Sequence, residues 1–205
     1  KKNSGAICNA LTVDVEDWFQ VENFKPWIPH DSWSRQESRV EANTLFILDL
    51  LDRCGKTLTG TLQDGSSKPV QCTFFILGWT AAAYPALVRE IVDRGHEIAS
   101  HGYSHQLAMT QSASAFRRDI ARSKLLLEDL SGNVVVGYRA PSFSITETAL
   151  DIIAESGFTY DSSYNSFEMN PRYGRLRLPP QIKSGRAGKL KNGLIEVPIS
   201  NLNVA

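Results

Sequence analysis

The chain has 205 residues, of which 42% are hydrophobic and 21% charged, a composition typical of one globular domain. The 22 Lys and Arg residues balance 22 Asp and Glu residues, so the formal net charge is zero. This balance disfavours a strongly basic nucleic-acid-binding protein and an acidic tail. No uninterrupted apolar run reaches the roughly 18 residues of a membrane-spanning helix. We therefore expect one domain, residues 1–205, with no transmembrane segment and no nucleic-acid partner.

The N-terminal segment and the cysteines bear on the compartment. Two lysines open the chain, but acidic residues follow before any long apolar stretch, so no secretory signal is visible. The chain begins without Met, and we expect a processed or trimmed sequence. Three sparse cysteines do not form a disulfide framework and favour a reducing compartment; they are Cys8, Cys54 and Cys72.

Short apolar runs rich in β-forming residues predict six strands. They cover residues 10–15, 72–77, 96–100, 134–138, 158–160 and 194–199. Helical periodicity predicts four helices between them, over residues 43–54, 80–94, 114–130 and 144–156. The alternation of strands and helices predicts an α/β fold.

Glycines and a capping box set the predicted helix ends. A capping box over Ser144 to Glu147 opens the last helix. A glycine ends each of the four helices; these are Gly55, Gly95, Gly132 and Gly157. The first helix is apolar on most sides, so we expect it to be well buried. Residues 56–69 and 165–191 are predicted loops, because they are rich in polar and turn-forming residues.

His101 and His105 are the most informative pair of residues. Two imidazoles at positions i and i+4 converge on one metal ion if the segment turns helically. They follow a predicted strand, and α/β proteins place active sites at the carboxyl ends of their strands. The alternative is two unrelated histidines that are close in sequence by chance.

Three carboxylates lie at the end of the first predicted strand: Asp14, Glu16 and Asp17. Carboxylates this close repel one another unless a cation or a shared proton is present. Strand alternation puts Asp14 and Glu16 on one face, and Asp17 can join them where the chain turns. Two imidazoles and one carboxylate suit a catalytic Zn²⁺ or a similar divalent ion. Read alone, the acidic segment also fits a solvated turn.

Two further charged residues end predicted strands. Arg139 can clamp a carboxylate with two hydrogen bonds, or it can form an ordinary surface ion pair. Asp161 fits either a site residue or a turn-forming aspartate.

Five motifs, taken together in chain order, resemble the polysaccharide deacetylase family, which is the NodB-homology domain of carbohydrate esterase family 4. They read TVDVEDWF, TFFILG, HEIASHGYSH, YRAPSFS and FTYDSS, and the resemblance spans roughly residues 10–200. The spellings DVEDWFQV and CTFFILGW are similar to the exopolysaccharide-cluster subgroup, which is related to PuuE and to Helicobacter-type peptidoglycan deacetylases. The resemblance implies a distorted (β/α) barrel of seven or eight strands. The subgroup continues beyond this sequence, so we expect a barrel incomplete at its C-terminal end, and residues 56–69 look like an insertion.

The resemblance also implies roles for individual residues. Asp14 matches the general base that activates water, and Arg139 matches the arginine that orients this base. His101 and His105 match the metal-binding pair, with Zn²⁺ expected first and Co, Ni or Mn as alternatives. Related members space their two acids by one residue, which selects Glu16 as the third ligand; Asp17 is its rival. The implied substrate-binding residues are Trp18, Tyr103, Pro141, Phe143 and Asp161.

The implied function is metal-dependent hydrolysis of N-acetyl groups from hexosamines in a polysaccharide, either an exopolysaccharide or peptidoglycan. The metal ion and a backbone N–H near Tyr103 or Trp18 would stabilise the oxyanion. The family usually supplies a late His as general acid, but no His follows His105. Two alternatives stay open: an allantoinase-like hydrolase of a non-sugar amide, and a carbohydrate-binding module that has lost catalysis. A polysaccharide partner suggests the envelope of a bacterium, but no secretory signal is visible. We therefore expect a cytoplasmic or envelope-associated protein.

Overall fold

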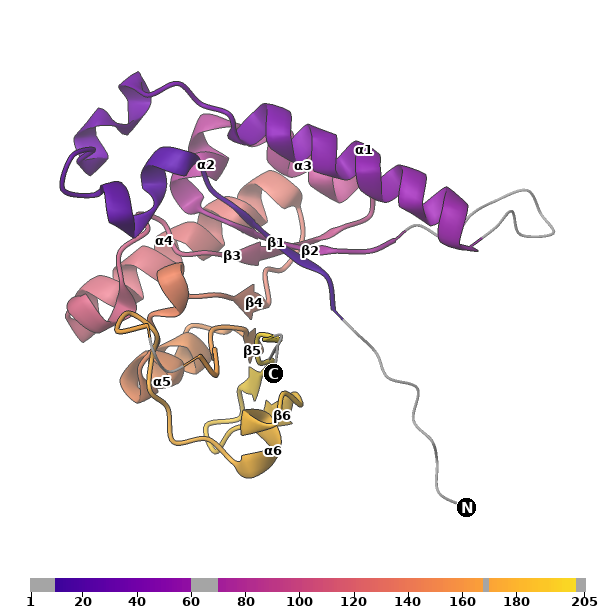
Figure 1. The fold of residues 1–205 in the computed structure, drawn as a ribbon. Helices are drawn as coiled ribbons and strands as arrows, with labels where there is room; N and C mark the ends of the chain where they lie inside the picture. Colours follow the sequence, from indigo (N-terminus) through magenta and orange to yellow (C-terminus); the bar gives the residue numbers. More distant parts are fainter. Residues whose placement is uncertain (1–9, 60–69, 168–169, 202–205) are drawn as a thin grey trace, which may run out of the picture.

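A single sheet organises the chain. The computed structural model describes residues 10–59, 70–167 and 170–201. Within these residues seven strands form one sheet in the order β1-β2-β3-β4-β5-β7-β6 (Figure 1). Neighbouring strands pair in parallel, except that β6 and β7 are antiparallel. The strands are β1 (Thr12–Val15), β2 (Thr73–Ile76), β3 (Glu97–Ser100), β4 (Gly137–Tyr138), β5 (Tyr160–Asp161), β6 (Gly188–Lys189) and β7 (Ile195–Glu196).

The parallel register aligns the carboxyl ends of six strands along one edge of the sheet. Val15 of β1 pairs with Ile76, which pairs with Ser100, and the row continues through the last residues of β4, β5 and β7. The next residue of each chain segment therefore leaves the sheet at this edge, where α/β proteins place their sites. Four of the six residues that follow these strands are polar or charged: Glu16, His101, Arg139 and Ser162.

Helices connect and cover the strands. They are α1 (Val40–Thr59), α2 (Gly78–Ala83), α3 (Pro85–Asp93), α4 (Ala113–Ser131), α5 (Glu147–Glu155) and α6 (Pro180–Lys183). In Figure 1, α1 and α3 lie side by side, and α4 packs against α2, α3, α5 and β3. Three short 3₁₀ helices follow β1: η1 (Trp18–Gln20), η2 (Glu22–Phe24) and η3 (His30–Arg35). Across the described ranges, none of the helices combines the length and apolarity of a bilayer span.

The core is built around the central strands. Phe74, Phe75 and Ile76 of β2 are all fully buried, as expected for a parallel strand that is covered on both faces. Leu48 of α1 and Ile91 of α3 are also fully buried in this core. The core therefore holds the carboxyl edge of the sheet in a fixed position.

The predicted α/β class is confirmed. The sheet does not close: β1 and β6 stand at its two edges, which is consistent with a distorted barrel. Each predicted strand overlaps an observed one, but residues 134–138, 158–160 and 194–199 yield only the two-residue strands β4, β5 and β7. The predicted loop over residues 165–191 was wrong in part, because it contains α6 and β6. The predicted helix ends at Gly95, Gly132 and Gly157 are confirmed. Each of these glycines follows the end of a helix by one or two residues and has a positive φ.

Three of the four predicted helices differ in their boundaries, two of them as follows. The single helix predicted over residues 80–94 is divided into α2 and α3, because Pro85 cannot donate a backbone hydrogen bond and begins a new helix. The predicted cap Ser144 is also wrong: α5 begins at Glu147, and the hydroxyl of Thr146 accepts from the N–H of Ala149. The hydroxyl of Ser144 instead accepts from the N–H of Met109.

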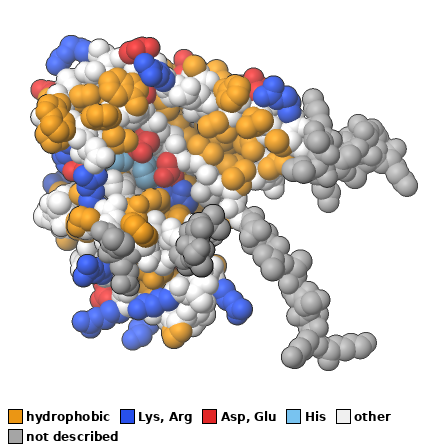
Figure 2. Space-filling model, viewed as in Figure 1, with side chains coloured by type: hydrophobic (Ala, Val, Ile, Leu, Met, Phe, Trp, Pro, Cys, Tyr) orange, Lys and Arg blue, Asp and Glu red, His pale blue; other side chains and the backbone are white. Residues whose placement is uncertain are grey.

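The first predicted helix is longer and more exposed than expected. It starts at Val40, continues through Gly55 and ends at Thr59, so Gly55 does not terminate it and residues 56–59 are not a loop. The remainder of that predicted loop, residues 60–69, lies outside the described part of the chain. Phe46 is 62% exposed and Leu50 is 44% exposed, so the expectation of a well-buried helix was wrong. In Figure 2, hydrophobic side chains are visible over this part of the surface.

Candidate active site

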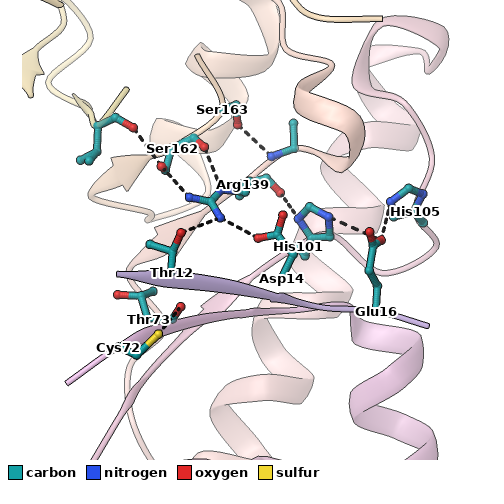
Figure 3. A network of polar contacts seen from close by, with 12 residues as sticks. Thr12, Asp14, Glu16, Cys72, Thr73, His101, His105, Arg139, Ser162 and Ser163 are labelled. Atoms are coloured by element: carbon teal, nitrogen blue, oxygen red, sulfur yellow. Dashed lines mark hydrogen bonds and ion pairs between the residues drawn. The ribbon is translucent and has the colours of Figure 1, made fainter. Parts of the chain in front are cut away.

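Glu16, His101 and His105 form a cluster at the carboxyl edge of the sheet. Nε2 of His105 lies 2.6 Å from Oε2 of Glu16, and Nε2 of His101 lies 3.8 Å from the same oxygen (Figure 3). Potential ligand atoms of the three residues all lie within 4.8 Å of one another. Both imidazoles are buried, whereas the Glu16 side chain is 22% exposed. Figure 2 shows histidine surface beside acidic side chains in a hollow of this face.

A loop, and not a helical turn, brings the two imidazoles together. Gly102 has a φ of 73° and His105 has a φ of 51°, so the chain turns through left-handed conformations. The carboxylate of Asp119 on α4 accepts from the N–H of Tyr103 at 2.8 Å and from the N–H of Ser104 at 3.1 Å. The helical turn that the spacing suggested is therefore replaced by a loop that α4 holds in place.

A backbone carbonyl orients His101. Its Nδ1 lies 2.9 Å from the carbonyl oxygen of Arg139, and a carbonyl oxygen only accepts hydrogen bonds. Nδ1 therefore carries the proton, and the lone pair of Nε2 faces Glu16. Burial lowers the pKa of His101, and the nearby charges of Asp14 and Glu16 offset this effect only in part. The ring is consequently neutral at neutral pH.

Glu16 supplies the negative charge of the cluster. Burial raises the pKa of Glu16, but the interactions with His105 and His101 together outweigh burial, so the net pKa is lowered. The buried Oε2 atom of Glu16 has no hydrogen bond of good geometry within the described residues, although it touches His105. Two imidazole nitrogens and one ionised carboxylate are the ligand set of a divalent metal ion with open positions. The residues present therefore fit such an ion.

An ion pair between Asp14 and Arg139 lies beside this cluster. The guanidinium of Arg139 donates to Oδ1 of Asp14 at 2.6 Å and to the hydroxyl of Thr12 at 3.0 Å. It also donates to the backbone oxygen and to the hydroxyl of Ser162, each at 3.0 Å, and stacks 4.0 Å from the centre of the Phe75 ring. Arg139 is 4% exposed and Asp14 is 28% exposed. Arg139 is thus held in place by several partners, and it orients the partly exposed carboxylate of Asp14.

Asp17 does not join the cluster, which corrects its prediction as a rival ligand. Its Oδ2 atom accepts from the hydroxyl of Ser38 at 2.7 Å and from the N–H groups of Arg39 and Val40 at 2.8 and 3.1 Å. Its Oδ1 atom accepts from the N–H of Trp18 at 2.9 Å. The chain leaves the strand and enters η1 at this point, so alternation no longer predicts the direction of the side chain. Asp17 caps η1 and the start of α1.

The predicted substrate-binding residues occupy different environments. Trp18 is 39% exposed, and its indole N–H donates to the carbonyl of Glu37 at 2.9 Å. Pro141 is buried, and Phe143 is half-buried with its ring 5.4 Å from the ring of Tyr173. Trp18 and Phe143 thus retain surface that a ligand can reach.

Tyr103, for which the resemblance implies substrate binding, is almost fully buried. It is 8% exposed, its hydroxyl accepts from Arg122 at 2.8 Å, and the Arg122 guanidinium lies 3.5 Å from the centre of its ring. The N–H groups of Tyr103 and Trp18 donate to the carboxylates of Asp119 and Asp17, respectively. These two N–H groups are therefore already paired and are not available to an oxyanion.

Asp161 lies beneath the site and not on a substrate surface. It is fully buried, and its carboxylate accepts from the N–H and the hydroxyl of Ser163 at 3.0 and 2.7 Å. The hydroxyl of Ser163 in turn accepts from the N–H of Ala140 at 2.8 Å. The resemblance implied a substrate contact for Asp161, but its side chain is fully buried here.

Sequence reasoning missed the residue beside Asp161. Glu196 of β7 is fully buried and accepts from the N–H of Tyr164 at 3.0 Å. Burial, together with the charge of Asp161, raises the pKa of Glu196 to about 10. Burial also raises the pKa of Asp161, to about 6. The signal was a single acid inside the apolar run LIEVPI at the end of a strand.

The fold and the site together define a class of protein. It is an α/β domain that carries two imidazoles and a carboxylate at the carboxyl edge of its sheet, beside an ion pair between an arginine and a second carboxylate. The sequence pattern of the family described as "Polysaccharide deacetylase" matches residues 61–160. A peptidoglycan deacetylase from Helicobacter pylori is 31% identical over 104 residues, which cover 51% of this chain and 36% of that protein. A peptidoglycan-N-acetylglucosamine deacetylase from Bacillus cereus is 33% identical over 89 residues, covering 43% of this chain and 32% of that protein.

A solved structure extends the likeness to most of the chain. A crystal structure from Mycobacterium smegmatis, described as a polysaccharide deacetylase, superposes with a TM-score of 0.67 and 27% identity, covering 93% of this chain and 58% of that one. These matches support a polysaccharide deacetylase domain of the NodB type. The chain aligns with about a third of the length of the two curated relatives.

Proposed function

We propose that this chain hydrolyses N-acetyl groups from hexosamine units of a polysaccharide. The observation that carries the proposal is the position of the Asp14–Arg139 ion pair beside the cluster of Glu16, His101 and His105. A partly exposed, oriented carboxylate next to a site for a divalent ion is the arrangement that metal-assisted hydrolysis of an amide requires. The names of the relatives, which are deacetylases of peptidoglycan, support this substrate class.

Glu16, His101 and His105 would hold the metal ion, with Zn²⁺ as the first expectation and Co, Ni or Mn as alternatives. A divalent ion in such a site polarises a carbonyl oxygen and lowers the pKa of water. Arg139 prepares the site in two ways, because its carbonyl orients His101 and its side chain orients Asp14. One residue thus links the metal ligands to the acid–base group.

Asp14 is the proposed general base. Its carboxylate accepts a proton from the water molecule that attacks the acetyl carbon, while Arg139 fixes the direction of the carboxylate. Cleavage of the C–N bond then requires a proton on the leaving nitrogen. Asp14 can return the proton that it has accepted, so acetate and a free amine are formed with protons in balance. Trp18 and Phe143 offer aromatic surface for sugar rings, and the centre of the Phe143 ring lies 6.0 Å from the guanidinium that holds Asp14.

Acetate release tests the proposal. The wild-type protein, supplied with zinc, should release acetate from N-acetylglucosamine oligomers or from peptidoglycan. The Asp14→Asn variant, which keeps the shape of the side chain, should lose at least about 10²-fold in turnover with zinc binding retained. Asp31→Asn removes an exposed acid and serves as the control, with unchanged turnover. Turnover of Asp14→Asn within about tenfold of wild type would contradict the assignment of the base.

A further inference from the structure

A small cavity lies between the loop that follows β1 and the loop that carries His105. Its volume is about 30 Å³, and its lining includes Gln20, Glu22 and His105. Each of these three side chains has one buried polar atom without a hydrogen bond in the described part of the chain. The three atoms are Nε2 of Gln20, Oε2 of Glu22 and Nδ1 of His105. Buried polar atoms of this kind require a partner, since leaving one unpaired costs about 1–3 kcal/mol.

The contacts at the other polar atom of each side chain show whether the unpaired atom is a hydrogen-bond donor or an acceptor. Oε1 of Gln20 accepts from the N–H of Asp17 at 2.6 Å and from the hydroxyl of Thr80 at 3.3 Å, so Nε2 of Gln20 is a donor. Oε1 of Glu22 lies 3.5 Å from Nζ of Lys25, which leaves Oε2 as an acceptor. Nε2 of His105 faces Glu16, so Nδ1 is the ring nitrogen left over for the cavity.

We propose that one water molecule binds in this cavity and connects Nδ1 of His105 to the carboxylate of Glu22. The cavity exceeds the roughly 10–15 Å³ that a water molecule needs. Water can accept from both Gln20 and His105 and can donate to Glu22, which satisfies all three atoms. A cation is disfavoured by the N–H of Gln20, and an anion is disfavoured by the carboxylate of Glu22.

Glu22 is then a positioning residue for His105. With a metal ion held by Glu16, His101 and His105, Nδ1 of His105 would donate to the water molecule, and the lone pair of Nε2 would be directed to the ion. The carbonyl of Arg139 does the same for His101 by direct contact. Groups that hold the second nitrogen of a ligand histidine typically change metal affinity about 10–100-fold when they are removed. This role rests on the proposed function, in which His105 is a metal ligand.

The test combines crystallography with zinc titration. A high-resolution structure of the wild-type protein should show one water molecule within hydrogen-bond distance of all three atoms. Competition with a chromophoric chelator should show zinc binding about 10–100-fold weaker in Glu22→Ala, and a smaller loss in Glu22→Gln, which keeps an oxygen acceptor. Glu37→Gln, an exposed acid that pairs only with Arg39 in the described residues, is the control and should bind zinc like wild type.

A spectroscopic readout separates positioning from a general structural effect. In the zinc-loaded protein, the Nδ1 proton of His105 should give a downfield resonance in slow exchange with solvent. Glu22→Ala should move this resonance upfield and speed its exchange, while the thermal midpoint of the zinc-free protein stays near that of wild type.

Three results would overturn the inference. They are a cavity without an ordered water molecule, a Glu22→Ala variant whose zinc affinity stays within about twofold of wild type, and an unchanged Nδ1 resonance in that variant. If Glu22→Ala does not fold, the wild-type structure and Glu22→Gln still decide the question. Should the water molecule and the zinc effect be found while the wild-type protein releases no acetate, the proposed function fails and the positioning role stands.

Discussion

The buried acid pair beneath the site makes folding stability depend on pH. Glu196 is fully buried, and its pKa is raised from 4.5 to about 10 by burial and by the charge of Asp161. Between these values the folded protein binds a proton at Glu196 that the unfolded chain has released. Because the folded state binds more protons, the free energy of unfolding falls as the pH rises through this window.

The size of the effect follows from the shift. One proton of difference corresponds to about 1.4 kcal/mol per pH unit. Asp161, with a pKa raised to about 6, titrates mainly below the range from about pH 6.5 to 8.5. Glu196→Gln resembles the protonated acid in shape and can still accept from the N–H of Tyr164. The stability of the variant relative to wild type should therefore increase by about 3 kcal/mol from pH 6.5 to pH 8.5.

Urea denaturation at a series of pH values measures this difference. The wild-type stability should decline with increasing pH, and the Glu196→Gln curve should be flatter, so that the two diverge toward high pH. Glu37→Gln, which changes an exposed acid, should give a curve parallel to wild type. Parallel curves for wild type and Glu196→Gln would refute the reasoning, because they would mean that Glu196 is ionised in the folded state.

Three further predictions concern the site. Arg139→Lys should reduce turnover by about 10²-fold or more, because one ammonium group cannot replace the contacts of the guanidinium to Asp14, Thr12 and Ser162. Steady-state acetate release measures this loss, and turnover near wild type would contradict the prediction. Asp119→Ala should lower the free energy of unfolding in urea by about 1–3 kcal/mol and weaken zinc binding, because the N–H groups of Tyr103 and Ser104 lose their acceptor. Asp129→Ala, which removes an exposed acid from the same helix, should change neither quantity. Removal of divalent ions with a chelator should abolish acetate release, and added zinc should restore it; activity that survives complete chelation would argue against a metal-dependent reaction.

Much of the fold was predictable because its signals are local. Apolar runs marked the strands, and glycines marked the ends of α3, α4 and α5. The boundaries that sequence reasoning missed depend on partners distant in the chain. Asp17, for example, caps α1 from across a segment of about 20 residues, which places the start of that helix at Val40.

The site was predictable in part for a related reason. Parallel strands bring their carboxyl ends to one edge, so Glu16, His101 and Arg139 could be placed together from their positions after predicted strands. The direction of a side chain after a strand ends depends on the loop that follows. That is why Asp17 and Tyr103 point elsewhere than expected. Glu196 was missed because an acid in an apolar run gives no sign of the buried partner that it meets.

The central claim is that Glu16, His101 and His105 share one divalent ion. Anomalous diffraction from crystals grown with zinc measures this most directly. The account predicts a single strong peak in contact with Nε2 of His101, Nε2 of His105 and the carboxylate of Glu16, with Asp14 beside it and still paired with Arg139. Zinc that binds only elsewhere, or a peak that the two histidines share with Asp17 in place of Glu16, would contradict the account.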